Sequence, residues 1–208
     1  MNQSSVRAPA AARPAARAAA ARRRHSTAAP RSSLASQQAA TAAPVFHYTE
    51  IELQTGPGIS VHNIMPQLRA EVARLGVAEG FVNVLSRHTT TAVCINEYET
   101  RLLDDIRQFL RRLAPPTDPY LHNDLHLREA PEGWPGGWEA WAQQEPENAH
   151  SHLLSLMLGN SETVPISGGE LKTGVWQSVM LVELDGPRKR SVGVQIVGTA
   201  PPRAGGQQ

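Results

Sequence analysis

Residues 175–197 read VWQSVMLVELDGPRKRSVGVQIV, and this stretch decides the fold class. Val175–Leu184 and Ser191–Val197 are rich in β-branched residues, which favour strands, and residues 185–187 (Asp-Gly-Pro) have the composition of a turn. Two shorter strand-like runs precede them, Thr163–Ser167 and Leu171–Thr173, with Gly168 and Gly169 between. The C-terminal third is therefore predicted to form an antiparallel meander.

The residues upstream alternate between strand and helix patterns. Apolar side chains at helical spacing predict two amphipathic helices, and an Asn before a third apolar segment with a Gly after it predicts a shorter one. The predicted helices are Ile64–Leu75, Leu102–Leu113 and Asn148–Leu158, and the predicted strands are Val45–Leu53, Gly80–Leu85 and Thr89–Ile95. Strands flanked by segregated helices predict the α+β class: a single compact domain with a mostly antiparallel sheet and a few flanking helices.

The predicted domain covers residues 44–200, and residues 201–208 are predicted to be a disordered tail. Within the domain, residues 123–146 hold three of the four Trp residues and show no clear period. Loops of this length are usually functional or mobile. We therefore predict a long loop or insertion at 123–146.

The N-terminal segment has a different composition. Residues 1–49 contain seven Arg and no Asp or Glu, and they are rich in Ala, Ser and Pro. Such a segment buries too little apolar surface to offset its ordering entropy, so residues 1–43 are predicted to be a disordered leader. The composition is typical of an organellar transit peptide, and the scattered Ser, Thr and Pro favour plastid over mitochondrion. A low-complexity extension and a basic nucleic-acid-binding arm are the alternatives.

Composition also argues against several function classes. Beyond residue 49 the chain carries 13 basic and 19 acidic residues, a formal charge of −6, so nucleic acid is not an expected partner. No apolar stretch approaches the roughly 20 residues of a membrane span, so no membrane partner is expected. Cys94 is the only cysteine, which excludes an internal disulfide and leaves His and carboxylates as the realistic ligands for a transition metal.

His88 begins the sequence His-Thr-Thr-Thr directly after a predicted strand. An imidazole followed by hydroxyl side chains can hold a metal ion or donate hydrogen bonds to phosphate oxygens. The alternative is a loop histidine followed by threonines that serve only their β propensity.

Further imidazoles occur at His122, His150 and His152. Three neutral imidazoles with a fourth position open form a catalytic zinc pattern. His150 and His152 lie about 200° apart around a regular helix, so only one of the two is expected in such a site. Exposed amides at the helix start near Asn148 would attract phosphate.

Glu97 and Asp105 are candidates for acid–base chemistry or for binding a divalent cation. Their spacing of eight places both carboxylates near one helical face, provided that the helix begins before Glu97. The alternative is that an Asp near a helix start interacts favourably with the helix dipole.

Two further motifs lie in the C-terminal third. Residues 174–177 (Gly-Val-Trp-Gln) combine a glycine that permits close backbone approach with Gln177, which could orient a ligand; a turn with a core Trp is the alternative. Residues 188–190 (Arg-Lys-Arg) lie at the tip of the predicted hairpin. The default interpretation is that their side chains are exposed to solvent, and the alternative is that they contact an anionic ligand of a neighbouring subunit.

Taken together, these motifs resemble the YjbQ family, also labelled UPF0047 or secondary thiamine-phosphate synthase. The resemblance spans about residues 45–198. The matching motifs, in chain order, are HTTTA at 88–92, INE at 95–97, Asp105, YLH at 120–122, NAHSHL at 148–153, LGNS at 158–161, GVWQ at 174–177 and RKR at 188–190.

The resemblance implies a compact α+β domain that assembles as a homotrimer, with the imidazoles in a cleft between subunits where some members bind a metal ion. It implies that His88, His122 and His152 bind a divalent ion, zinc or magnesium, and that Glu97 and Asp105 assist catalysis. The residues expected to contact the substrate are Thr89, Thr90, Asn148, Trp176, Gln177 and Arg190.

Two functions follow as expectations, both with a small phosphorylated metabolite as ligand. The first is a metal-assisted transferase that joins a hydroxymethylpyrimidine diphosphate to a thiazole phosphate. The second is a non-enzymatic trimeric protein that binds a metal or a metabolite. Two departures from the family pattern bear on both: Val175 replaces the usual Thr, which removes a hydroxyl, and the segment 123–146 is longer than usual.

Overall fold

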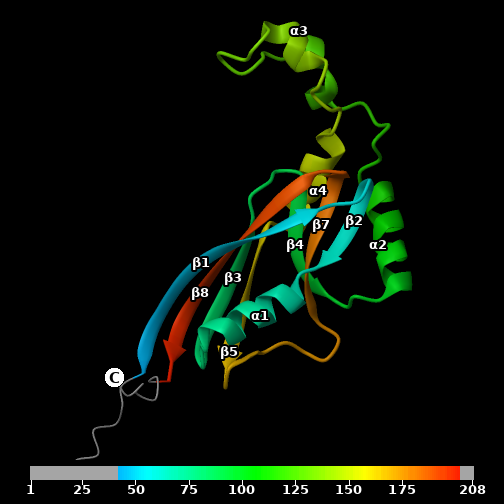
Figure 1. Ribbon diagram of the computed structural model, residues 1–208. Coiled ribbons are helices and arrows are strands. Elements are labelled where there is room, and N and C mark those ends of the chain that lie inside the picture. Colours follow the sequence, from blue (N-terminus) through cyan, green and yellow to red (C-terminus); the bar gives the residue numbers. More distant parts are fainter. Residues whose placement is uncertain (1–41, 202–208) are drawn as a thin grey trace, which may run out of the picture. The chain divides into compact units, whose positions relative to one another are not determined.

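The computed structural model describes residues 42–201, which form two antiparallel sheets with accompanying helices (Figure 1). The large sheet contains, in spatial order, β1 (Ala43–Gln54), β8 (Lys189–Ala200), β3 (Glu79–Ser86), β5 (Ser161–Ser167) and β6 (Glu170–Leu171). The small sheet contains β2 (Gly58–Asn63), β7 (Ser178–Gly186) and β4 (Thr91–Asn96). All strand pairs in both sheets are antiparallel, which confirms the predicted α+β class.

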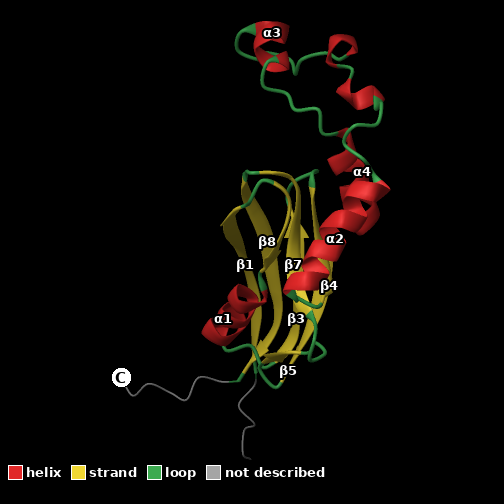
Figure 2. Ribbon diagram, turned by 90° about the vertical axis from the view of Figure 1, so that its right-hand side faces the viewer, coloured by secondary structure: helices red, strands yellow, loops and turns green. Residues whose placement is uncertain are grey.

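Within residues 42–201 four α-helices accompany the sheets: α1 (Met65–Leu75), α2 (Thr100–Leu113), α3 (Gly137–Ala142) and α4 (Ala149–Leu158). α1 has a Pro in its first turn and ends, as predicted, at Gly76, whose φ of 66° is left-handed. α2 and α4 run along the small sheet (Figure 2) and share an apolar cluster with it. The large sheet, the small sheet and the pair α2 and α4 therefore form three layers, and α1 packs in the apolar core that the two sheets share.

The strand β7 is apolar on both faces because it lies between two layers. Val179 and Leu181 pack in the core between the two sheets, whereas Met180, Val182 and Leu184 pack against α2 and α4. All five side chains are buried. A strand with both faces buried needs no polar alternation, which explains the continuous apolar run in this part of the sequence.

The outer face of the large sheet, on the side away from the small sheet, carries exposed aromatic residues. Phe46 on β1 is 76% exposed, Tyr48 is 53% exposed and Phe81 on β3 is 40% exposed. The strand register places Phe46 and Phe81 on either side of Val197. No helix within residues 42–201 covers this row of apolar side chains.

Two details of the C-terminal prediction are wrong. β7 and β8 follow each other along the chain but lie in different sheets, so residues 187–188 form a corner between sheets rather than the turn of a meander. Residues 175–177 precede β7 as a turn, in which Gln177 Oε1 accepts a hydrogen bond from the Gly174 N–H at 2.7 Å.

The strand β2 has no counterpart among the predicted elements, because it is short and contains Gly, Ser, His and Asn.

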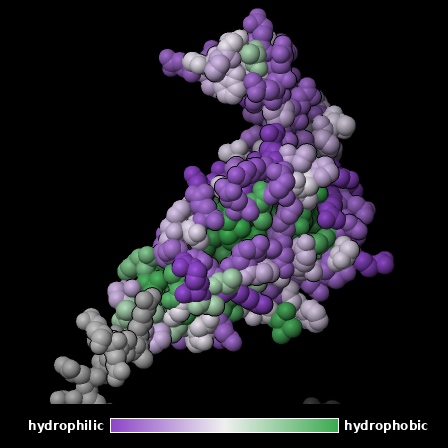
Figure 3. Space-filling view, in the orientation of Figure 1, coloured by the Kyte–Doolittle hydropathy of each residue, from purple (hydrophilic) through white to green (hydrophobic). Residues whose placement is uncertain are grey.

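The segment 123–146 contains more local structure than the predicted loop. Besides α3 it includes the 3₁₀ turn Leu125–Leu127, and a second such turn, Leu121–Asn123, leads into it. Arg128 organises the segment: its Nη2 donates to Glu145 Oε1 at 2.9 Å, and its guanidinium lies 5.0 Å from the ring centroid of Trp141. The surface of this insertion, at the top of Figure 3, is largely hydrophilic.

The predicted leader and tail lie outside the described residues, except for residues 42, 43 and 201. The transit peptide and the plastid location therefore stay predictions. Within residues 42–201 no helix is long and apolar enough to cross a membrane.

Candidate functional site

The loop between β3 and β4 carries His88, Thr89 and Thr90, and a hydrogen bond fixes the imidazole. The backbone N–H of Ser191, near the start of β8, donates to Nε2 of His88 at 2.9 Å. Because Nε2 accepts this bond, the neutral ring carries its proton on Nδ1. Burial, with the nearby Arg190 guanidinium, lowers the pKa of His88, so the ring is neutral at pH 7. His88 thus offers one N–H donor.

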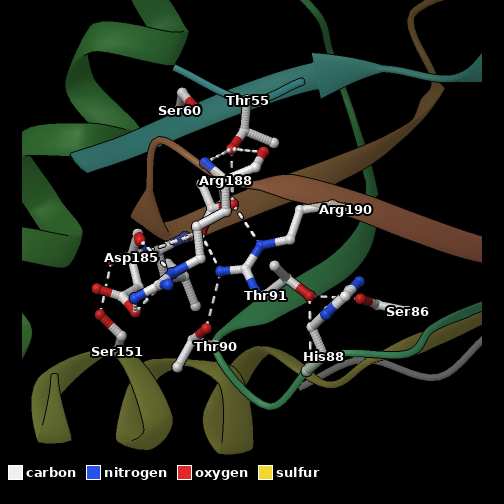
Figure 4. A network of polar contacts seen from close by, with 12 residues as sticks. Thr55, Ser60, Ser86, His88, Thr90, Thr91, Ser151, Asp185, Arg188 and Arg190 are labelled. Atoms are coloured by element: carbon white, nitrogen blue, oxygen red, sulfur yellow. Dashed lines mark hydrogen bonds and ion pairs between the residues drawn. The ribbon is translucent and has the colours of Figure 1, made fainter. Parts of the chain in front are cut away.

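A buried ion pair beside this loop joins the two sheets (Figure 4). On β8, Arg190 donates from Nε to Glu183 Oε2 at 2.6 Å and from Nη2 to Glu183 Oε1 at 2.7 Å. Arg190 Nη2 also donates to the hydroxyl of Thr90 at 2.9 Å. Glu183 on β7 is 0% exposed and Arg190 is 6% exposed. The expectation that Arg190 is solvated is therefore wrong, because its charge is neutralised inside the protein.

Glu183 collects further donors. Thr55 donates its hydroxyl proton to Oε2 at 2.8 Å, and the backbone N–H of Asp185 donates to Oε1 at 2.8 Å. Burial alone would raise the pKa of Glu183, but the hydrogen bonds from Arg190, Asp185 and Thr55 outweigh it and hold the pKa below its usual value. Glu183 is therefore ionised at neutral pH.

A hollow of about 420 Å³ opens beside His88, and we call it the His88 hollow. Its polar lining includes Arg87, His88 and Thr89 from the β3–β4 loop, and His152 and Asn160 from α4 and the residues after it. Most of these side chains carry hydrogen-bond donors. Arg87 is also paired with Glu50, so its charge is partly compensated.

His122 and His152 lie side by side. Their ring centroids are 4.9 Å apart with an angle of 71° between the ring planes. The contact is held by Asn123, whose Oδ1 accepts a hydrogen bond from the first N–H of α4, that of Ala149, at 3.1 Å. Burial, together with the neighbouring His122, lowers the pKa of His152. His152 is therefore neutral at pH 7.

His150 faces the other side of α4. It lines a separate hollow together with Arg111 and Leu184, whereas His152 lines the His88 hollow. Burial lowers the pKa of His150 as well.

Asn148 precedes α4 as predicted but does not cap it with its side chain. Its Nδ2 donates to Asp185 Oδ2 at 2.8 Å, and its Oδ1 is buried without a partner among the described residues. Because Asn148 is only 6% exposed, its predicted contact with substrate requires a ligand that reaches into the protein.

Of the eleven predicted site residues, only His88, Thr89 and His152 line the His88 hollow. Thr90, His122, Asn148 and Arg190 are not part of the lining, and neither are Glu97, Asp105, Trp176 and Gln177. The register of the small sheet explains why Glu97, Trp176 and Gln177 lie far from His88. Thr91 pairs with Glu183 at the end near His88, and Asn96 pairs with Ser178 at the other end, about 17 Å away along a six-residue strand. The loop that precedes β7 and the turn that follows it accordingly lie at opposite ends of the strand (Figure 1).

The position of α2 corrects the hypothesis about the two carboxylates. α2 begins at Thr100, so Glu97 precedes the helix and the two carboxylates share no helical face. The helix is capped instead by Glu99, whose carboxylate accepts from the N–H groups of Arg101 and Leu102. Asp105 lies on the exposed side of α2.

The three predicted metal ligands are only partly brought together. His152 contacts His122 and shares the hollow with His88, yet no group of three His, Cys, Asp or Glu within residues 42–201 is arranged to hold a metal ion. In addition, Nε2 of His88 accepts from Ser191 while Nδ1 carries the proton, so the ring as held here has no lone pair for a metal. The described part of one chain does not form a complete metal site.

Comparison with known proteins places the whole folded region in one family. The family model described as "UPF0047 protein YjbQ-like" matches residues 49–199. The chain belongs to the YjbQ-like family. A UPF0047 protein of Methanothermobacter thermautotrophicus is 35% identical over 149 residues, covering 72% of this chain and 90% of the relative. One of Archaeoglobus fulgidus is 35% identical over 148 residues, covering 71% and 99%.

Solved structures similar to this chain confirm the YjbQ-like fold. A YbjQ-like protein of unknown function from Sulfolobus solfataricus is 28% identical, with a TM-score of 0.63 over 75% of this chain and 99% of that structure. A hypothetical protein from Aeropyrum pernix is 31% identical, with a TM-score of 0.62 over 73% and 98%.

Glu183 and Asn123 are not among the residues predicted from the sequence. A signal for Glu183 is present in the YjbQ-like chain: it is the one acidic residue inside the apolar run from Val179 to Leu184. A carboxylate in a buried strand requires a cation or several donors, and Arg190 stands seven residues away. Asn123 follows His122 in the sequence and has no comparable signal.

Breaking the ion pair is predicted to destabilise the protein. Glu183→Ala leaves Arg190 buried and uncompensated, so we expect the free energy of unfolding to fall by about 3–5 kcal/mol. Chemical denaturation at pH 7 measures this change, with the exposed Glu170→Gln as control. A loss as small as that of the control would contradict the assigned role of the pair.

The same pair predicts a dependence of stability on pH. The pKa of Glu183 is lowered in the folded state, so its stabilising contribution is present above the unfolded pKa of about 4.3 and is lost as the pH falls through the folded value. Glu183→Gln cannot ionise, and its unfolding free energy is expected to fall less than that of the wild type between about pH 5 and pH 2. If the unfolding free energies of the two proteins fell in parallel over this pH range, the lowered pKa assigned to Glu183 would be contradicted.

Proposed function

We propose that the chain binds a small phosphorylated metabolite in the His88 hollow. The observation that carries this proposal is the anchoring of His88: Ser191 holds Nε2 at 2.9 Å and leaves Nδ1–H as a fixed donor beside the hollow. The Arg87 guanidinium, the Thr89 hydroxyl and the Asn160 amide add donors to the same lining. Several donors converging on one hollow suit phosphate oxygens.

Arg190 takes part in this proposal as a positioning residue. Its Nε and Nη2 groups donate to Glu183 and Thr90, so they are not available to a ligand. The bond to Thr90 fixes the loop that carries His88. Because Ser191 follows Arg190 directly, the same strand end also fixes the imidazole.

We further propose that the protein is a transferase of the thiamine-phosphate synthase type, on the strength of the family resemblance. In this reaction the thiazole nitrogen attacks the methylene carbon of the hydroxymethylpyrimidine diphosphate. The new C–N bond forms while the C–O bond breaks, and pyrophosphate leaves with the electron pair. The His88 N–H and the Arg87 guanidinium would stabilise the negative charge of the leaving group. The alternative is binding of the metabolite without turnover.

A homotrimer is the third part of the proposal. The outer face of the large sheet, with Phe46 and Phe81, has no cover within residues 42–201, and an exposed apolar patch of this kind is typical of an interface. On α4, Leu156 beside the hollow is 80% exposed. In a cyclic trimer a neighbour would bring its exposed Trp176 and Gln177 to this hollow, which would complete the predicted substrate contacts.

We propose that a divalent ion, zinc or magnesium, binds at His122 and His152 in the trimer, with the remaining ligands supplied by the neighbouring subunit. Glu97 and Asp105 are the candidates for those ligands, because neither forms an ion pair within residues 42–201. Imidazole ligands favour zinc over magnesium.

Pyrophosphate binding tests the hollow. Isothermal titration of the full chain with inorganic pyrophosphate is expected to show binding that His88→Ala weakens by about 10-fold or more, because a hydrogen bond to a charged ligand is lost. His126→Ala changes an exposed histidine outside the hollow and should bind like the wild type. Equal affinities for the two variants would contradict the proposed role of His88.

A turnover assay on the same proteins separates the two functions. Thiamine phosphate formed from the pyrimidine diphosphate and the thiazole phosphate by the wild type, and lost in His88→Ala, supports the transferase. Pyrophosphate binding without product formation supports the binding protein and contradicts the transferase.

The oligomeric state tests the interface. Light scattering coupled to size exclusion is expected to give a mass of three chains, and Phe81→Glu should lower it, because it places a charge in the apolar row. Phe109→Glu changes a residue of comparable exposure on α2 and should leave the trimer intact. A wild-type monomer, or the same mass for both variants, would contradict the proposed interface.

Metal analysis of the purified protein tests the metal site. The wild type is expected to retain a divalent ion through dialysis, His152→Ala to lose it, and His126→Ala to keep it. Equal metal content in the two variants would remove His152 from the site.

A further inference from the structure

A second hollow lies on the side of α4 opposite the His88 hollow. It measures about 330 Å³, and we call it the Arg111 hollow. Ile59 and Leu184, both buried, and Ala114 and Pro116 form apolar walls. Two polar side chains complete it, Arg111 from α2 and His150 from α4. Apolar walls with a few polar groups are the usual composition of a small-molecule site.

Arg111 supplies a positive charge that the described residues do not neutralise. None of the ion pairs within residues 42–201 includes it. A basic residue in the last turn of a helix interacts favourably with the helix dipole, and this explains Arg111 and its neighbour Arg112 equally well. Of the two, only Arg111 lines the hollow. A Cβ placed on Gly58 would lie 4.0 Å from Nη2 of Arg111, so the chain at Gly58 passes close to the guanidinium.

His150 supplies a donor. Its Nδ1 is buried and has no partner among the described residues. A buried lone pair is tolerated better than a buried N–H without an acceptor, so the proton belongs on Nε2. With Nδ1 enclosed by protein, Nε2 is the ring nitrogen that can reach the hollow. His150 therefore offers an N–H beside the Arg111 guanidinium.

We propose that the Arg111 hollow binds a small organic monocarboxylate. The planar guanidinium matches the two oxygens of one carboxylate, and the His150 N–H donates to the same group. One positive charge balances a carboxylate but not a phosphate dianion. The apolar part of the ligand packs between Ile59 and Leu184, and the volume, at the lower end of ligand cavities, limits the ligand to a small body. This site is independent of phosphate binding in the His88 hollow.

Benzoate is the test ligand, titrated into the full-length protein and followed by NMR chemical shifts. Saturable binding is expected, and Arg111→Gln should weaken it by about 10-fold or more, since a charged hydrogen-bonding partner is lost. His150→Phe keeps the ring and removes the N–H, and it should weaken binding by a smaller factor. Arg112→Gln makes the same change of net charge on the same turn and should bind like the wild type.

Two controls separate this site from the alternatives. Benzamide has the shape of benzoate without its charge and should bind at least about 10-fold more weakly. His88→Ala should bind benzoate like the wild type. The proposal is overturned by absence of saturable binding, by equal affinity for benzamide, by equal effects of Arg111→Gln and Arg112→Gln, or by loss of benzoate binding in His88→Ala.

Discussion

Glu183 and Arg190 form an ion pair between the two sheets, at the corner where β7 leads into β8. A buried carboxylate and guanidinium both lose their hydration, so such a pair adds little net stability, while breaking it leaves an uncompensated buried charge. The pair therefore acts mainly as a geometric constraint. It fixes the first residues of β8 against the end of β7, and through Thr90 and Ser191 it also fixes the loop that carries His88.

The second constraint is α4, which separates two hollows of different chemistry. His152 faces one side of the helix, with His122 and the donors of the β3–β4 loop, and His150 faces the other, with Arg111. Two residues along a helix correspond to about 200°, so the motif His-x-His distributes its imidazoles between two surfaces instead of concentrating them on one ion. With His150 on the other side of the helix, the ion that we propose at His122 and His152 would need further ligands from a neighbouring subunit.

Much of the fold follows from local sequence patterns, because helix period and β-branched runs are local properties. The end of α1 at Gly76 is one example. The assignment of β7 and β8 to different sheets is not local, since the composition of residues 185–187 allows a meander and a corner equally well. For the site, the sequence identified His88 and His152, which share one hollow, but not the distance to Trp176, which depends on the register of the small sheet.

Ser191 holds His88 in the Nδ1–H form beside the hollow in which we propose that phosphate binds. Long-range ¹H–¹⁵N NMR of the imidazole, with His88→Ala to assign the signal, tests this directly at pH 8. We expect an Nδ1–H tautomer in the free protein and a shift of the Nδ1 resonance on addition of pyrophosphate. An Nε2–H tautomer, or a resonance that does not respond to pyrophosphate, would contradict it.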